Sequence, residues 1–110
     1  MDDMELFISD FTDFLNKFQI EKGVLFGPFL PEGDGQRRDV MVVLVCKRWE
    51  GFRMQERRVP SCLEVRKLLG LSAVIDLYLY TPREFEHNLK YNGLLQIAVR
   101  DGIVIRPTTF

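Results

Sequence analysis

The sequence is poor in the residues that build metal centres and disulfide frameworks. It has one histidine and two cysteines, Cys46 and Cys62, which do not form a Cys-x-x-Cys motif. Structural zinc sites need a cluster of cysteine and histidine ligands, so we expect no zinc site. We expect both cysteines to be reduced and structural, Cys46 in a strand and Cys62 at a helix start.

Neither an excess of one charge nor a long apolar run is present. Lys and Arg total 15 against 16 Asp and Glu, a net charge of −1, whereas a general nucleic-acid binder is usually basic. No run reaches the roughly eighteen apolar residues of a membrane helix. The N-terminus, MDDME, is acidic, unlike the start of a signal peptide. We therefore expect a cytoplasmic protein with no membrane partner.

What the chain has is enough apolar sequence for one domain, residues 1–110, of which 46% are hydrophobic. Periodicity, turn residues and capping signals predict helices over 5–18, 61–69, 81 to about 89 and 94–100. Strands are predicted over 23–26, 39–46, 72–80 and 103–105. This alternation predicts an α/β (α+β) domain with a small mixed β-sheet and helices packed mainly on one face.

Local signals support several of these elements. Phe7, Phe11, Phe14 and Phe18 recur at helical spacing, so they form one face that packs in the core or, alternatively, docks a partner. Ser61 with Glu64, and Thr81 with Glu84, match the capping-box pattern at a helix N-terminus.

The segment from Lys47 to Val59 is basic and contains aromatic residues. We interpret it as a connection or an exposed strand extension. It either contacts RNA, an acidic protein or a nucleotide base, or forms a solvated face. His87 has no nearby nucleophile in the pattern and is interpreted as a surface residue.

Two isolated acids stand in otherwise apolar strands. Asp39 and Met41 share one face of the 39–46 strand because side chains alternate with a period of two. Asp76 repeats the pattern in the 72–80 strand. If the two carboxylates meet they form a candidate Mg²⁺ site. The alternative is that they are strand-end residues paired with Arg37 or with solvent.

These residues resemble the minimal nucleotidyltransferases, small relatives of DNA polymerase β that include the antitoxin halves of two-gene toxin–antitoxin modules. The resemblance rests on VLFGPF, RDVMVVLV, VIDLYLYTPREFE and NGLLQIAVRDGIVI, in that order along the chain. It implies that Gly27 is the turn glycine and that Asp39 and Asp76 are the first and third metal-binding aspartates. The implied chemistry is nucleotidyl transfer with two metal ions that align the attacking and leaving oxygens.

The sequence departs from this family pattern at decisive positions. Met41 replaces the second aspartate, and a thioether is a poor ligand for Mg²⁺. Pro28 replaces the serine that contacts phosphate, and proline has no N–H to donate. Glu32 and Asp34 place negative charge where a triphosphate would lie. Arg37, two residues before Asp39, is expected to pair with Asp39 and Asp76 in the space of a metal ion.

We therefore expect a degenerate member of this family, a non-catalytic binding or antitoxin-type protein that needs no cofactor. Expected partners are a small helical protein and a second copy of the chain, with nucleotide binding doubtful and confined to Gly27 and Arg37. The alternative is an active Mg²⁺-dependent nucleotidyltransferase that transfers a nucleoside monophosphate to a protein or small-molecule hydroxyl. There, Asp39 and Asp76 would be catalytic, with Glu32 or Asp34 as a substitute ligand. A third possibility is an unrelated α/β domain whose acids are structural.

Overall fold

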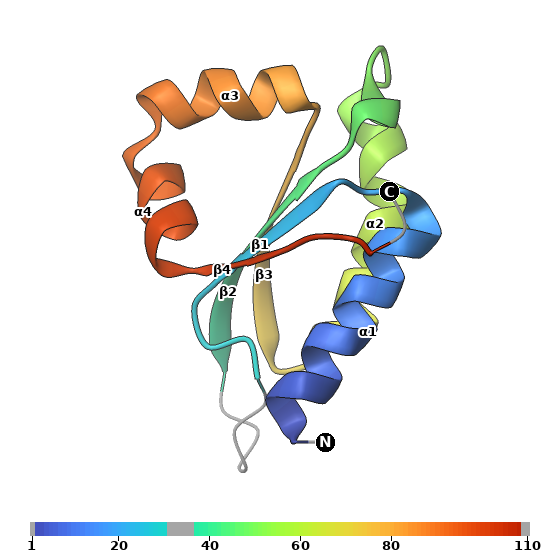
Figure 1. The fold of residues 1–110 in the computed structure, drawn as a ribbon, viewed down its shortest axis with the longest axis vertical. Coiled ribbons are helices and arrows are strands. Elements are labelled where there is room, and N and C mark those ends of the chain that lie inside the picture. The colour runs from blue at the N-terminus through green and yellow to red at the C-terminus, as the bar shows by residue number, and fades with distance from the viewer. Residues whose placement is uncertain (1, 31–36, 109–110) are drawn as a thin grey trace.

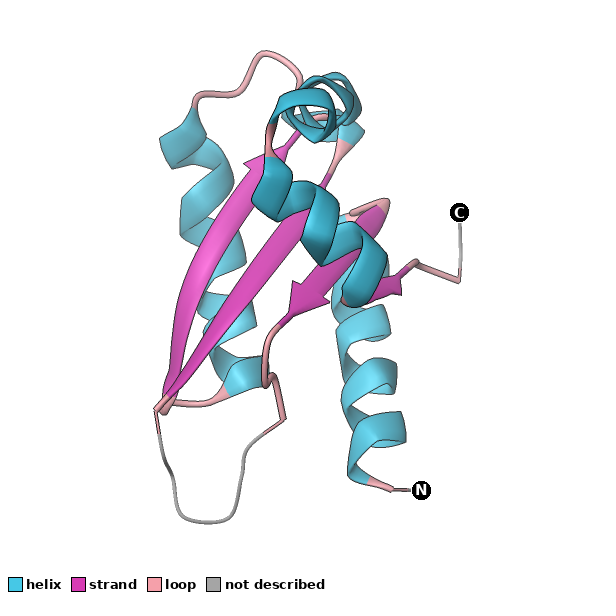
Figure 2. Cartoon of the chain, turned by 90° about the vertical axis from the view of Figure 1, so that its left-hand side faces the viewer, coloured by secondary structure: helices cyan, strands magenta, loops and turns pink. Residues whose placement is uncertain are grey.

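The structure is a computed structural model that describes residues 2–30 and 37–108. The strands of this part of the chain form one sheet in the order β3-β2-β1-β4 (Figure 1 and Figure 2). They are β1 (Lys22–Phe26), β2 (Arg38–Val45), β3 (Ala73–Tyr80) and β4 (Ile103–Ile105). Strand β1 pairs antiparallel with β2 and with β4, while β2 and β3 are parallel. The predicted mixed α/β domain is confirmed.

The helices lie on both faces of this sheet. They are α1 (Asp3–Phe18), α2 (Met54–Leu69), α3 (Pro82–Tyr91) and α4 (Gly93–Asp101), with a short 3-10 helix, η1 (Lys47–Trp49). The longer pair, α1 and α2, covers one face, and α3 with α4 packs on the other. We expected the helices to pack mainly on one face. The longer helices α1 and α2 do share one face, but α3 and α4 lie on the opposite face. No helix in the described ranges combines the length and hydropathy that a membrane crossing requires.

Strand β2 is one of the two inner strands of the sheet, and its valine-rich sequence is buried on both faces. Val40, Val42 and Leu44 point into the core under α1 and α2. The alternate residues Met41 and Val43 join a second, smaller core under α3 and α4. Burial on both faces is the reason that this strand is a continuous apolar run instead of an alternating one.

The phenylalanine face of α1 packs in the larger core, so the core interpretation is confirmed. Phe7, Phe11 and Phe14 are buried, and the rings of Phe11 and Phe14 meet edge to face with centroids 5.5 Å apart. Full burial of one such ring contributes about 1.5–3 kcal/mol. Asp2 is the N-cap of the helix, and its carboxylate accepts the Glu5 N–H at 2.8 Å.

The interpretation of residues 47–59 as a connection holds for residues 47–53 and is wrong for residues 54–59, which are helical. This segment forms η1 and the first turns of α2, which begins at Met54. The backbone N–H of Arg53 donates to the Glu56 carboxylate at 3.1 Å and so supports the helix start. Ser61 and Glu64 therefore lie inside α2, and Cys62 is an exposed residue of that helix, not a residue at its start.

The buried face of α2 explains why its start was missed. Arg57, Ser61, Val65 and Leu69 recur every fourth residue and are all buried. Two of these four residues are polar, so the sequence shows no apolar stripe at the start of the helix. The Ser61 hydroxyl donates back to the Arg57 carbonyl at 3.0 Å, a bond that serine makes inside helices as well as at caps.

The predicted capping box at the start of α3 is confirmed and is connected to α2. Thr81 and Glu84 exchange backbone-to-side-chain hydrogen bonds. The Glu84 carboxylate also accepts from the buried Arg57 guanidinium at 2.5 Å, and Arg57 donates to the Leu79 carbonyl at 3.1 Å. These contacts join α2, the end of β3 and the start of α3.

We expect Glu84→Gln to lower the free energy of unfolding by about 1 kcal/mol at pH 7, since the carboxylate is partly exposed. The Arg57 hydrogen bond holds the pKa of Glu84 below its ordinary value of 4.5. The stabilisation is therefore complete above that value and is lost as the pH falls through the lower folded-state pKa. Urea unfolding of both proteins between about pH 7 and pH 3 should show the difference disappear at the acidic end.

Glu86→Gln is the matched control because Glu86 is exposed on the same helix. A difference between wild type and Glu84→Gln that stays constant over this pH range would contradict the proposed role of the carboxylate charge.

Candidate functional site

The predicted acids lie on neighbouring strands and on one face of the sheet. In the parallel register, Asp39 of β2 is opposite Val74 of β3, and Met41 is opposite Asp76. Asp39 and Asp76 are therefore diagonal neighbours on the face that α3 and α4 partly cover, and both side chains are exposed. The structure thus brings the predicted pair of acids to one region of the surface.

Met41 occupies the position between them. It lies two residues after Asp39 on the same face and directly opposite Asp76. Its side chain is 8% exposed and packs in the smaller core. The donor set is two carboxylates and one thioether, which does not fit the oxygen-ligand requirement of a two-magnesium centre. In the described ranges, no group of three or more His, Cys, Asp or Glu side chains is placed to hold a metal ion.

Arg37 pairs with Asp39 but not with Asp76. Its Nη2 lies 3.4 Å from Asp39 Oδ1, and both side chains are 73% exposed. An exposed pair of this kind contributes about 1 kcal/mol or less. The part of the prediction that placed Arg37 beside Asp39 is confirmed, whereas the contact with Asp76 is not formed.

Gly27 lies against the backbone of Asp39, as expected for a turn glycine next to the acid strand. Its φ of +112° is rarely adopted by other residues. A Cβ atom at this position would stand 2.6 Å from the Asp39 carbonyl oxygen. The turn after β1 therefore needs glycine for two reasons, backbone conformation and space.

The residues after Gly27 direct carbonyl oxygens, not N–H groups, to the nearest charged side chain, which is Arg38. The carbonyls of Pro28 and Phe29 accept from the Arg38 guanidinium at 3.3 and 2.8 Å. The Phe29 ring is buried against Phe7, with centroids 5.1 Å apart. This end of the loop is fixed in the core. The rest of the loop, including Glu32 and Asp34, lies outside the described residues.

Arg38 is the residue that the sequence analysis missed. It is 4% exposed, and it also donates to the Leu69 carbonyl at 2.6 Å and to the Ser72 hydroxyl at 3.0 Å. Every acceptor is neutral. Period-two alternation was the available signal, because it puts Arg38 on the same face as the buried Val40.

The remaining candidate residues separate into surface and core. His87 is exposed, and its ring lies 5.2 Å from that of Tyr91, so the surface interpretation is confirmed. Lys47 and Arg48 are exposed, but Arg57 is 5% exposed, so the basic segment is not a uniform solvated face. Cys46 and Cys62 are both free thiols, the first buried and the second exposed.

Comparisons of the chain with protein-family models, with curated proteins and with solved structures found no match.

We expect Arg38→Met to lower the free energy of unfolding by about 3 kcal/mol, because it leaves the carbonyls of Pro28, Phe29 and Leu69 and the Ser72 hydroxyl without this donor. Urea unfolding monitored by circular dichroism measures the change. Arg37→Met removes the same charge from the neighbouring residue and is expected to change stability by about 0.5 kcal/mol or less. Equal effects of the two substitutions would refute the anchoring role of Arg38.

Proposed function

We propose that this chain is a nucleotidyltransferase-like domain without catalytic activity that acts in the cytoplasm by binding another protein. The partner that fits the resemblance is a small helical protein, as in an antitoxin-type pair. The observation that carries the proposal is Met41, an apolar and buried side chain between Asp39 and Asp76. A two-metal mechanism requires a hard, negatively charged ligand at that position.

The loop after Gly27 supports the same proposal. A phosphate-binding turn offers several N–H donors to the anion. Pro28 has no N–H, and the carbonyls of Pro28 and Phe29 are directed to Arg38. These contacts surround the Arg38 guanidinium with carbonyl acceptors, not with N–H donors. This arrangement disfavours a nucleotide triphosphate at the turn.

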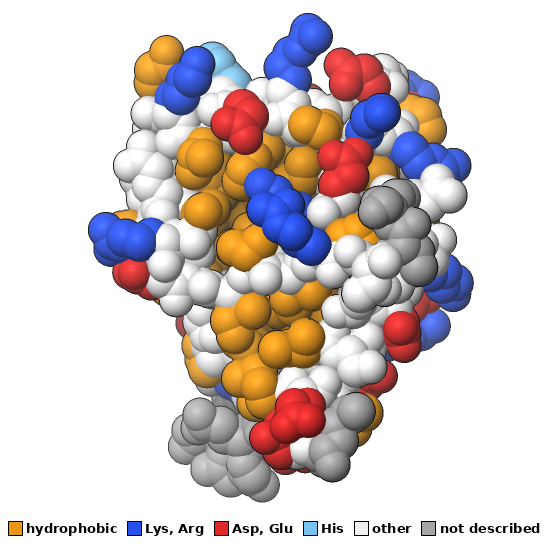
Figure 3. Space-filling view, viewed as in Figure 1, with side chains coloured by type: hydrophobic (Ala, Val, Ile, Leu, Met, Phe, Trp, Pro, Cys, Tyr) orange, Lys and Arg blue, Asp and Glu red, His pale blue; other side chains and the backbone are white. Residues whose placement is uncertain are grey.

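Exposed apolar residues support protein binding. Leu94 and Ile97 lie three residues apart on α4 and are 51% and 38% exposed, and Tyr91 before them is 77% exposed. This spacing places Leu94 and Ile97 on one side of the helix. Figure 3 shows further hydrophobic side chains across the middle of the molecule, where β1 and β4 pass between the two helix pairs. An amphipathic helix of a partner would cover such a surface.

The active nucleotidyltransferase is the second candidate, and it is favoured by the exposed positions of Asp39 and Asp76 on one face. Two carboxylates, together with phosphate oxygens and water, can coordinate one Mg²⁺ ion. Loss of the third ligand still removes several kcal/mol of charge stabilisation, and each 1.4 kcal/mol is about tenfold in rate. This cost is the reason that the non-catalytic function is preferred.

An NMR titration with ATP or GTP, with and without Mg²⁺, tests the proposal. We expect no metal-dependent shifts of the Gly27, Asp39 and Asp76 amides at ligand concentrations of about 1–5 mM. Clustered shifts at these residues that Asp39→Asn abolishes would support the active enzyme and overturn the proposal.

Met41→Asp tests the reason given for the loss of activity. It restores a third carboxylate in register with Asp76, so we expect Mn²⁺ to broaden amide resonances near residues 39, 41 and 76. Affinity for Mn²⁺ should exceed that of wild type by at least about tenfold, or 1.4 kcal/mol. Met41→Asn is the control, because it introduces a polar group of similar size without charge. If both variants bind Mn²⁺ no better than wild type, Met41 is not the residue that prevents metal binding.

A further inference from the structure

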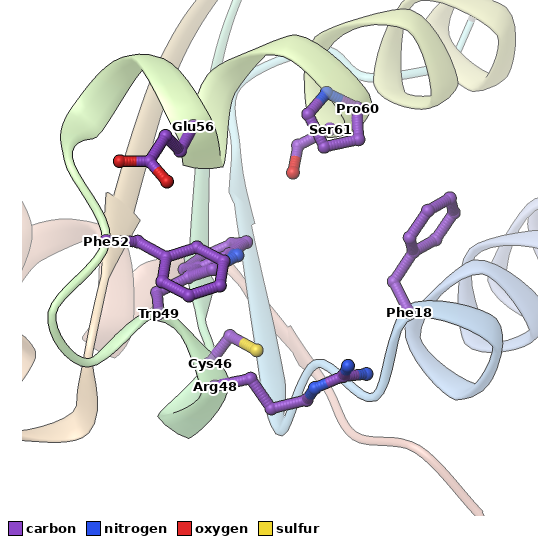
Figure 4. A pocket seen from close by; sticks show the side chains of 8 residues that line it. All are labelled: Phe18, Cys46, Arg48, Trp49, Phe52, Glu56, Pro60 and Ser61. Carbon is purple, nitrogen blue, oxygen red and sulfur yellow. The ribbon is translucent and has the colours of Figure 1, made fainter.

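A cavity opens on the α1–α2 side of the molecule, and it is separate from the acid pair. Its lining residues come from the end of α1, from η1 and from the first half of α2 (Figure 4). The cavity measures about 170 Å³. An apolar cavity of about 150 Å³ accommodates benzene, so this one has room for a single aromatic ring with a small substituent.

The walls of the cavity are mainly aromatic. Phe18 lies on one side, and Phe52 with Trp49 lies on the other (Figure 4). Cys46 lines the floor, and burial raises the pKa of its thiol above the ordinary value, so the floor carries no charge at neutral pH. Aromatic walls favour a planar apolar ligand, which packs against ring faces and edges.

Trp49 directs an unused donor into this space. Its side chain is 7% exposed, and its indole N–H forms no hydrogen bond in the described chain. No fully enclosed side-chain nitrogen or oxygen of the described residues lacks a partner, so the indole N–H has some access to solvent. Figure 4 shows the nitrogen on the ring edge that faces the cavity. A buried indole N–H usually finds an acceptor, and a ligand oxygen fits this position.

Charge at the cavity entrance favours an anionic ligand. Arg48 extends along one edge, where its Nη1 donates to Gln19 Oε1 at 2.8 Å and its other donors are free in the described chain. Glu56 on the opposite edge is paired with Arg53 at 3.2 Å, which offsets its negative charge. The uncompensated group at the entrance is therefore the Arg48 guanidinium, and guanidinium groups bind carboxylates well.

We propose that this cavity is a binding site for a small aromatic carboxylate of the benzoate class. The ring lies between Phe18 and Phe52. The carboxylate accepts hydrogen bonds from the Trp49 indole N–H and the Arg48 guanidinium. The site lies on the opposite face of the sheet from Asp39 and Asp76. A test of this proposal is therefore independent of the function proposed above.

The chain has a single tryptophan, so one indole N–H resonance reports on the site directly. We expect sodium benzoate to shift this resonance saturably, with a dissociation constant of about 1 mM or tighter. Acetate supplies the charge without the ring, and benzylammonium supplies the ring with the opposite charge. Both are expected to bind at least about tenfold more weakly than benzoate.

Substitutions of two exposed arginines assign the charge contribution. Arg48→Gln is expected to weaken benzoate binding at least about tenfold. Arg58→Gln removes the same charge from an exposed residue of α2 that does not line the cavity, and it should leave the affinity within about twofold. Both positions are on the surface, so thermal melting curves should match wild type and exclude loss of the fold.

Three results would overturn the proposal. The first is an indole resonance that does not move at about 10 mM benzoate. The second is benzylammonium that binds as tightly as benzoate, which would identify Glu56 as the dominant charge. The third is an equal effect of Arg48→Gln and Arg58→Gln, which would show that the guanidinium at the entrance makes no specific contact.

Discussion

The buried guanidinium of Arg38 is the contact on which the arrangement of this domain depends. It has no carboxylate partner among the described residues, and its hydrogen bonds go to carbonyls and a hydroxyl of three separate segments. A buried charge without a counter-ion is costly unless its donors are satisfied. The turn after β1, the end of α2 and the start of β3 must therefore converge on the first residue of β2.

Two other arginines connect α2 to the edge strand β3 by hydrogen bonds. Arg66 donates to the Ala73 carbonyl at one end of the strand, and Arg57 donates to the Leu79 carbonyl at the other. Edge strands expose unpaired backbone groups that invite pairing with another chain. These two side chains satisfy carbonyls at both ends of β3, and Asp76 adds a charge near its middle. The edge is thereby protected while α2 is held in place.

These anchors also define what the candidate site can do. Arg38 holds the turn after Gly27 through the carbonyls of Pro28 and Phe29. On the other face of β2, Asp39 is a diagonal neighbour of Asp76 on β3, and Met41 packs in the smaller core. Two exposed carboxylates thus flank a buried apolar side chain on one face of the sheet. The aromatic cavity beside Trp49 uses the opposite side of the sheet and different residues.

The sequence alone determined the elements whose signals are local. The phenylalanine face of α1, the valine run of β2 and the Thr81 capping box each depend on residues within one or two turns, or on a period of two. The shared face of Asp39 and Asp76 also followed from that period once both strands were assigned. Only the tertiary structure decided the start of α2 and the roles of Arg38, Arg57 and Trp49. The partners of the two arginines lie on other elements, and a polar residue is buried only where the rest of the fold supplies its hydrogen bonds or, as at Trp49, leaves a cavity beside it.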